Sequence, residues 1–327
     1  MTERRCGESG TGAEVIVLES QTIDPGARAG RQVSEGAPHN QWWDVWHHFK
    51  VHKGALVGAA IFLLIFVSVV CGPYVWRVSP TYIDVSAINS GFSWAHPFGI
   101  DELGRDLLAR IMTGGRISIA VGLTAMFVSL VLGSLVGILA GYFKALDGPL
   151  MRLTELFLGL PVLPLLLVMM MLFRETLAHI FGLNLGIFVL IVSAIGLTSW
   201  MSTARVVRGE VLAIKQREFV LASSTFGSPP HRIILRHVLP NVLSPIMVSA
   251  TLGIATAIIT ESTLSFLGLG FPPDFPTWGR LLFDGVEHLQ DDPRLALAPG
   301  IAIALTVLGV NYVGDGLRDA LDPQLRR

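Results

Sequence analysis

Residues 117–143 read ISIAVGLTAMFVSLVLGSLVGILAGYF and contain no Asp, Glu, Lys or Arg. A helix needs about 20 apolar residues to cross the hydrocarbon layer of a bilayer, so this segment is long enough to span a membrane. In the whole chain of 327 residues, 51% are hydrophobic and 15% are charged, whereas soluble domains carry about 25% charged residues. The composition therefore excludes an ordinary water-soluble globule.

Further charge-free windows flank this segment, and together they predict an all-α integral membrane fold with six transmembrane helices. In chain order, the predicted spans are 54–76, 117–143, 156–173, 183–204, 238–260 with a continuation to 269, and 295–314. The third span is the shortest and holds Pro161 and Pro164, which remove backbone donors and are expected to kink it.

The basic residues between the spans predict the orientation. With a cytoplasmic N-terminus, seventeen of the 24 Lys and Arg residues lie on the cytoplasmic side. This distribution agrees with the positive-inside rule, so we expect both termini in the cytoplasm.

Two segments precede the first span. Residues 1–41 are polar and lack the layout of a signal peptide, which predicts a disordered cytoplasmic tail. Residues 42–53 combine aromatic and basic side chains, as expected of an interfacial helix in contact with membrane lipid. His48 and His52 stand one helical turn apart there, but no carboxylate or cysteine completes a ligand set, so we predict no metal site.

Small residues recur every four positions in the second span, at Ala125, Ser129, Gly133, Gly137 and Gly141. This spacing places them on one helical face, where a neighbouring backbone can approach closely. The spacing leaves open whether the neighbour belongs to this chain or to a partner subunit.

Several enzymatic motifs are absent from the sequence. None of the four lysines follows a glycine, so the GxxxxGK[ST] phosphate loop of P-loop ATPases is missing, and HExxH, GxSxG and paired cysteine motifs are missing too. The net charge of −1 offers no electrostatic footprint for nucleic acid. Glu261 is the single acidic residue inside the spans, and we interpret it as a hydrogen-bonded structural group.

The segment 205–241, RVVRGEVLAIKQREFVLASSTFGSPPHRIILRHVLPN, lies between the fourth and fifth spans. Apolar residues at helical spacing predict one helix that stops at Gly227, and Ser228 to Pro230 can restart a second helix that Pro240 ends. A helix, turn and helix at the cytoplasmic face suits docking in a groove of a soluble partner. The alternative is a solvated basic loop that merely obeys the positive-inside rule.

This segment resembles the EAA loop of ABC importer permeases. The resemblance falls on Leu221, Ala222, Ser223, Gly227, His237, Leu239 and Pro240, and residues 237–241 have the HxLPN form of the peptide and nickel branch. Leu221 stands where the family has an acidic residue, and Ser223 replaces its second alanine. We therefore expect an apolar contact with the ATPase from Leu221 and Phe219, with Arg217 and Glu218 as the nearest polar residues.

Three other stretches resemble the second permease of oligopeptide and dipeptide importers. They are HPFGIDELGRD at 96–106, ESTLSFLGLG at 261–270 and GDGLRDALDP at 314–323. The resemblance implies a type I ABC importer permease fold over residues 54–327, with 205–241 as the cytoplasmic coupling loop, in the plasma membrane of a prokaryote. It also implies three kinds of partner: a second homologous permease, two ATPase subunits or domains that hold ATP and Mg, and an extracytoplasmic substrate-binding protein. This chain itself is expected to bind no cofactor and to catalyse no reaction.

The predicted function is thus the translocation pathway for di- or oligopeptides. One alternative is a permease of the same branch for nickel or another small solute. A secondary transporter, or a membrane-embedded enzyme or scaffold, would lack the ATPase partners.

The loop at 268–298 is predicted to lie outside the membrane. Its prolines stiffen its start, Thr277 can cap a short helix, and several carboxylates make it acidic. We expect it to roof the external mouth and to contact the binding protein through Trp278 and Arg280. The alternative is a simple surface loop.

Overall fold

The computed structural model describes residues 46–47, 49–84, 86, 88 and 90–321. The predicted disordered tail and the first residues of the predicted interfacial helix lie outside this part of the chain. Within the described part of 42–53, residues 46, 47 and 49–51 are helical, and the rings of Trp46 and Phe49 stack with centroids 6.3 Å apart.

Six helices in the described residues are long and apolar enough to cross a membrane, which confirms the predicted number of spans. They are α2 (Lys53–Val75), α3 (Leu107–Tyr142), α5 (Val162–Phe181), α6 (Leu183–Lys215), the continuous run Pro230–Phe266, and α11 (Arg294–Leu321). The continuous run consists of α8 (Pro230–Ile233), one π-helical turn η3 (Ile234–Val238) and α9 (Leu239–Phe266). Three shorter helices are α4 (Lys144–Leu158), α7 (Glu218–Thr225) and α10 (Trp278–Val286).

The predicted third span, 156–173, is misplaced. Residues up to Leu158 belong to α4, and the spanning helix α5 begins only at Val162. Pro161 is the residue before α5 and Pro164 lies in its first turn, where a missing backbone N–H breaks no helical hydrogen bond. The prolines therefore start this helix instead of kinking it.

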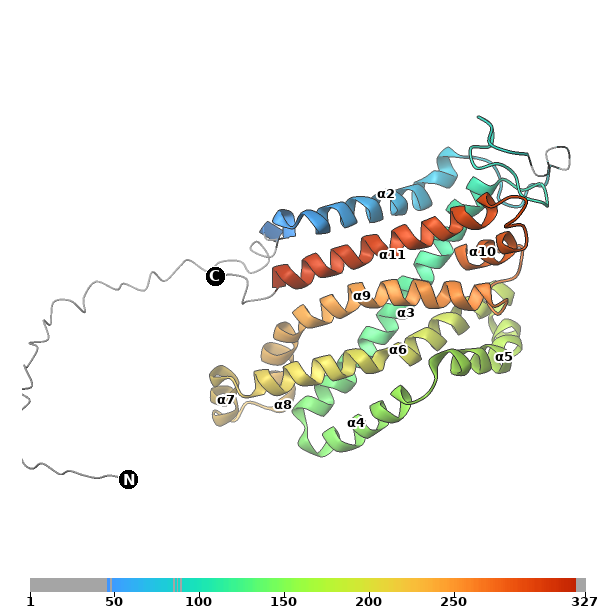
Figure 1. Ribbon diagram of the computed structural model, residues 1–327. Coiled ribbons are helices and arrows are strands. Elements are labelled where there is room, and N and C mark those ends of the chain that lie inside the picture. Colours follow the sequence, from blue (N-terminus) through green and yellow to red (C-terminus); the bar gives the residue numbers. More distant parts are fainter. Residues whose placement is uncertain (1–45, 48, 85, 87, 89, 322–327) are drawn as a thin grey trace, which may run out of the picture. The chain divides into compact units, whose positions relative to one another are not determined.

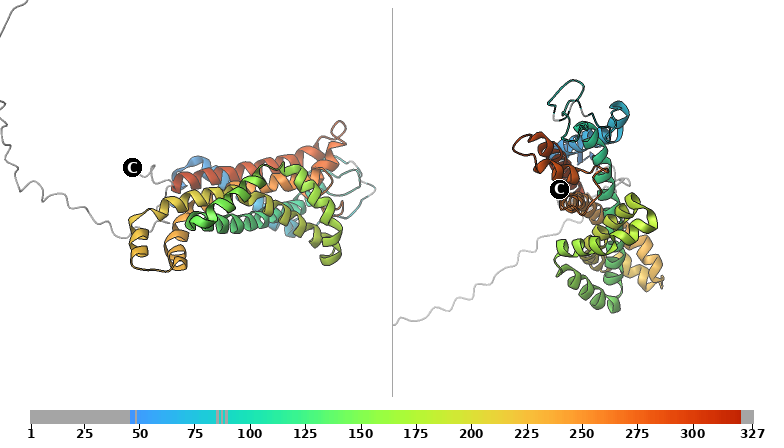
Figure 2. Two further views of the ribbon diagram at one scale, coloured as in Figure 1. Left: turned by 90° about the horizontal axis from the view of Figure 1, so that it is seen from below. Right: turned by 90° about the vertical axis from the view of Figure 1, so that its right-hand side faces the viewer.

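The helices form one bundle of antiparallel and crossing elements. Figure 1 shows α2, α11, α9 and α6 side by side, with α3 crossing behind them, and each of these neighbours is in contact. One end of the bundle carries α7 and is called the α7 end; the opposite end carries α10 and the connection between α2 and α3, and is called the α10 end. Figure 2 shows α7 and α8 projecting beyond the spans at the α7 end.

The small-residue face of α3 packs against α6 of the same chain. A Cβ atom on Gly133 would lie 2.6 Å from the carbonyl oxygen of Trp200, and one on Gly137 would lie 2.6 Å from that of Ala204. The side chain of any other residue would push the two backbones apart. The question that the sequence left open is thus answered, because the seam lies within the subunit.

Arg116 of α3 supplies a hydrogen-bond donor that α2 lacks. Pro73 has no N–H to donate to the carbonyl of Val69, four residues earlier. Arg116 Nε donates to that oxygen at 2.9 Å, and its Nη2 donates to the carbonyl of Val70 at 2.5 Å. The guanidinium also lies over the ring of Tyr74, 5.0 Å from its centroid.

We expect Arg116→Leu to lower the melting temperature of the purified chain in detergent. The loss of two hydrogen bonds from a charged group corresponds to about 2 kcal/mol or more, and it leaves the carbonyl of Val69 without a donor. Arg116→Lys is the matched control: it keeps the charge but not the planar fork, and should fall between Leu and wild type. Equal melting of all three proteins would contradict this role.

Candidate coupling loop and external helix

The predicted single helix between Val211 and Gly227 is two helices. α6 ends at Lys215, Arg217 takes an extended backbone conformation, and α7 begins at Glu218. The turn lets Val220 pack into an apolar cluster at the α7 end that includes Val211 and Ile214. A straight continuation of α6 would carry Val220 away from this cluster, so side-chain burial explains the break.

Gly227 ends α7, as predicted, with a φ of +76°. The amide of Gly227 donates to the carbonyl of Ser224 at 3.0 Å, and the amide of Ser228 donates to that of Ser223 at 3.2 Å. This pair of bonds is the Schellman motif, which satisfies the last carbonyls of a helix and needs a left-handed residue that glycine adopts most easily. The local sequence therefore sets the direction in which the chain leaves α7.

Pro240 does not end the second helix of the loop, contrary to the prediction. It lies in the first turn of α9, and the helical run continues to Phe266. Pro240 has no N–H to donate. In the π turn just before it, the amide of Leu239 donates to the carbonyl of Ile234, five residues earlier, and the helix continues without a break. The side chain of Asn241 donates to the carbonyl of His237 at 2.6 Å.

The structure brings the two arms of the loop together. The ring of Phe219 on α7 lies 5.9 Å from that of His237, and Val220 and Val238 are buried in the same cluster. The remaining predicted residues are at the surface: Arg217, Glu218, Leu221, Ala222 and Pro240 are exposed, and Ser223 and Leu239 are half-buried. α7 thus turns one apolar residue inward and presents its other faces outward.

Phe226 was missed by the sequence analysis, although it is the most exposed large apolar residue of the loop. Its side chain is 88% exposed at the C-terminal end of α7. The sequence feature that could have revealed it is a bulky aromatic residue immediately before Gly227, the glycine that ends the helix. Together with Phe219 and Leu221, it gives α7 an exposed apolar surface.

At the α10 end, Thr277 caps α10 as predicted, its hydroxyl oxygen accepting from the amide of Arg280 at 3.2 Å. The prediction that Trp278 contacts a partner is wrong in this structure, because the side chain is 0% exposed. Its Nε1 donates to the carbonyl of Ile111 at 3.0 Å. The spacing of Trp278, Leu281 and Gly285, one helical face, could have revealed that this face packs inward.

Arg280 is directed along α10 and is largely enclosed. Its Nε lies 3.0 Å from Oδ1 of Asp284, and its guanidinium lies over the ring of Phe283. Both contacts are within α10, so Arg280 stabilises this helix. Its predicted contact with a binding protein stays a prediction.

Residues 110–327 match the family described as "Binding-protein-dependent transport system inner membrane component". The chain belongs to this family of ABC transporter permeases. Residues 40–91 match a second description, "N-terminal TM domain of oligopeptide transport permease C". The permease is therefore a multi-pass membrane subunit and not an enzyme.

Curated relatives resemble the permease over most of its length. The dipeptide transport system permease protein DppC of Bacillus subtilis is 41% identical over 286 residues, covering 87% of this chain and 86% of that protein. The oligopeptide permease protein OppC of the same organism is 37% identical, covering 88% and 90%. The glutathione permease protein GsiD of Pectobacterium atrosepticum is 34% identical, covering 87% and 92%.

Among solved structures, the permease is similar in fold to a chain of the MetNI methionine ABC transporter in an inward-facing conformation. The TM-score is 0.53 with 19% sequence identity, over 66% of this chain and 96% of that chain. At this identity the likeness concerns the fold alone.

The HPFGIDELGRD stretch of the permease forms a buried ion cluster at the α10 end. Oδ2 of Asp101 accepts from Arg105 Nε at 2.9 Å and from Arg110 Nη1 at 2.6 Å. Oδ1 of Asp101 accepts from the amides of Leu103 and Arg105. Arg110 also reaches Asp284 of α10 at 3.4 Å, so the cluster ties the connection before α3 to α10.

Glu261 is fully buried near the end of α9, and its interpretation as a hydrogen-bonded structural group is confirmed. The hydroxyl of Ser265 donates to Oε1 at 2.7 Å, and that of Ser262 lies 3.4 Å from Oε2. Gly279 of α10 packs directly on Ser262. The ESTLSFLGLG stretch therefore packs against α10 through Ser262.

Proposed function

We propose that the permease forms, together with a second homologous permease, the pathway of an ATP-driven importer for short peptides. The observation that carries this proposal is α7, a short helix held beyond the spans by one buried side chain, with exposed apolar residues on its other faces. The printed names of the relatives support the substrate class, since dipeptides, oligopeptides and glutathione, a tripeptide, are all short peptides.

In this proposal the α7 end and both termini are cytoplasmic, in the plasma membrane of a prokaryote. The basic residues support this orientation. The exposed basic residues at the α7 end include Arg205, Arg217, Arg232 and Arg236. At the α10 end, Arg77 is exposed. The other arginines there are held by internal contacts with carboxylates or carbonyls, namely Arg105, Arg110, Arg116, Arg174, Arg280 and Arg294. Free positive charge therefore gathers at the α7 end, as the positive-inside rule requires.

The proposed mechanism is alternating access. Two ATPase subunits or domains hold ATP and Mg, and each permease inserts its α7 into a groove on one of them. Closure of the ATPases on ATP moves α7, and because Val220 anchors α7 to α6 and α9, the spans follow. An extracytoplasmic substrate-binding protein delivers the peptide at the α10 end.

Reconstitution tests this function. The permease is assembled in liposomes with the second permease, the ATPases and the binding protein encoded beside it, and uptake of a labelled dipeptide and of ⁶³Ni²⁺ is compared. We expect ATP-dependent uptake of the peptide that vanadate blocks. Uptake of nickel alone, or uptake driven by a proton gradient without ATPases, would contradict the proposal.

We expect Leu221→Asp to weaken, but not abolish, the binding of the ATPases. Leu221 is exposed, so the substitution leaves the fold intact while placing a charge in an apolar contact. The loss of one such contact corresponds to about 1.4 kcal/mol, or tenfold in affinity. Titration of detergent-solubilised permease complex with labelled ATPase measures it, and Gln216→Asp, in the adjoining turn, is the control for added charge. Unchanged affinity in Leu221→Asp would show that Leu221 lies outside the contact.

A further inference from the structure

A cavity of about 390 Å³ lies at the α10 end, in the connection between α2 and α3. Its wall is held by close backbone contacts: the amide of Asp84 donates to the carbonyl of Gly104 at 2.8 Å, and the amide of Ile100 donates to that of Ser90 at 3.2 Å. A Cβ atom on Gly104 would lie 2.6 Å from the carbonyl oxygen of Asp84. Glycine at 104 therefore allows the segments around Asp84 and Gly104 to approach each other closely at the wall of this cavity.

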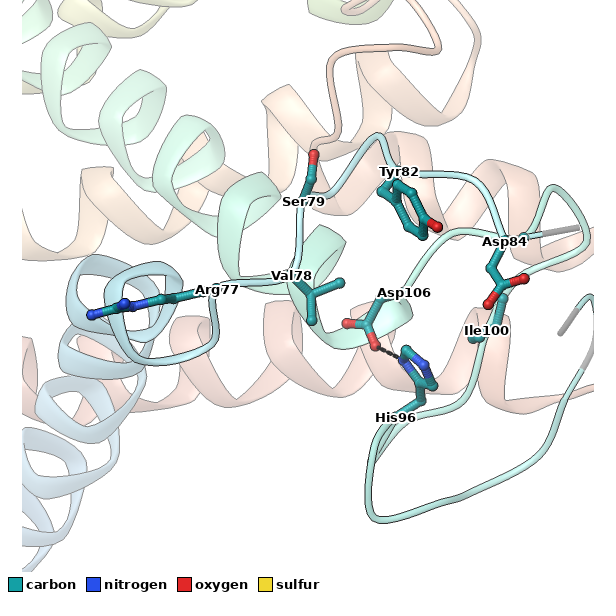
Figure 3. Close-up of a pocket in the computed structure, with 9 residues that line it drawn as sticks. Arg77, Val78, Ser79, Tyr82, Asp84, His96, Ile100 and Asp106 are labelled. Atoms are coloured by element: carbon teal, nitrogen blue, oxygen red, sulfur yellow. Dashed lines mark hydrogen bonds and ion pairs between the residues drawn. The ribbon is translucent and has the colours of Figure 1, made fainter. Parts of the chain in front are cut away.

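The polar groups of the cavity favour a cation. Figure 3 shows Tyr82, Asp84, His96 and Asp106 around one space, with the side chain of Arg77 directed away from them. Both oxygens of Asp106 are engaged, Oδ1 by Trp76 Nε1 and the amide of Ala109, and Oδ2 by His96 Nδ1 at 2.7 Å. The carboxylate of Asp106 is thus held in place at the wall of the cavity by Trp76, Ala109 and His96.

Asp84 has capacity for a further partner. Its Oδ1 accepts from the amide and the hydroxyl of Ser86, while its Oδ2 accepts no bond from the described part of the chain. The hydrogen bonds from Ser86 lower the pKa of Asp84 below its usual value, so the carboxylate is ionised at neutral pH. Because Asp84 lines the cavity, this oxygen is available to a cation that enters it.

One exposed aromatic residue lines the cavity, and a second lies on a neighbouring turn. Tyr82, which lines it, is 62% exposed. His96, which also lines it, closes a turn with Ser93 through paired backbone hydrogen bonds, and this turn carries Trp94, which is 93% exposed. Aromatic side chains around a pocket are typical of protein–protein contacts in which the partner inserts an anchor residue.

We propose that this cavity is a socket for a Lys or Arg side chain of the extracytoplasmic substrate-binding protein, with Asp84 as its ion partner and Tyr82 as an aromatic contact at its wall. The inference rests on the proposed function, since it needs a binding protein at the α10 end. A protein surface is favoured over lipid headgroups because the carboxylates of the cavity would repel an anionic bilayer surface.

The test uses the whole transporter, both permeases with their ATPases, in nanodiscs. The ATPase rate is measured against the concentration of peptide-loaded binding protein. We expect Asp84→Lys to raise the KM for the binding protein about tenfold with little change in kcat, and Asp84→Asn to raise it less. Both variants should flatten the dependence of KM on salt, because an ion pair is lost.

Glu175→Lys is the matched control, because Glu175 is an exposed carboxylate at the same end of the bundle, next to Arg174, and lies outside both the cavity and the loop 268–298. Subunit ratios in the purified complexes show whether each variant assembles. Equal KM values for Asp84→Lys and Glu175→Lys, or for Asp84→Asn and wild type, would overturn the socket. Contact of this surface with lipid instead of the binding protein would give that result. If the ATPase rate of the wild-type complex does not change with the binding protein at any concentration, the proposed function is overturned, and the socket with it.

Discussion

Gly227→Val is expected to give a permease that reaches the membrane but neither retains its ATPases nor transports. A Cβ atom on Gly227 would meet no atom within 4 Å, so crowding is not the cause. The cost comes from the φ of +76°, which a β-branched residue adopts only with strain of about 1–3 kcal/mol. The chain relieves this strain by leaving the Schellman turn. The exposed residues of α7, Phe219, Leu221 and Phe226, then no longer have the orientation that they have in the wild type.

Co-purification of the ATPases and peptide uptake measure this effect. Gly227→Asn is the control for backbone conformation, because asparagine tolerates the left-handed region, and it should retain both activities in large part. Gly209→Val is the control for added volume, since Gly209 lies on α6 with open space around it and an ordinary helical φ. If Gly227→Val keeps the wild-type ratio of ATPases and still transports, the loop is not the coupling element.

Asp101→Ala is expected to prevent accumulation of the folded permease. The carboxylate is buried between two guanidiniums, and the side chain of Arg110 is buried as well. Removing one member of a buried ion cluster leaves the others uncompensated and costs about 3–5 kcal/mol. Because the cluster reaches Asp284, the loss should also loosen α10 from α3.

Membrane content and melting temperature in detergent measure this effect. Asp101→Asn keeps the shape but removes the charge, so it should also be strongly destabilised. Glu102→Gln is the matched control: Glu102 is adjacent but partly exposed and pairs with His288, and exposed pairs contribute about 1 kcal/mol or less. Wild-type stability in both Asp101 variants would show that the arginines are satisfied in another way.

Local features of the site could be predicted from the sequence, and features that depend on packing could not. The end of α7 at Gly227 and the cap at Thr277 depend on one residue and its nearest backbone groups, so both predictions are confirmed. The break between α6 and α7 depends on where Val220 finds apolar neighbours, some of them in α9. No pattern within residues 211–227 contains that information.

By itself, the sequence determined that the chain crosses a membrane with six helices and ends its short projecting helix at Gly227, because hydropathy and backbone preference act over a few neighbouring residues. The tertiary structure alone decided that the small-residue face of α3 meets α6, that Trp278 is buried, and that the helix continues through Pro240. Each of these depends on which surfaces meet across distant parts of the chain, since a contact face can be recognised from spacing but its partner cannot. For the same reason the cavity beside Asp84 emerges only when residues 77–106 fold back on themselves.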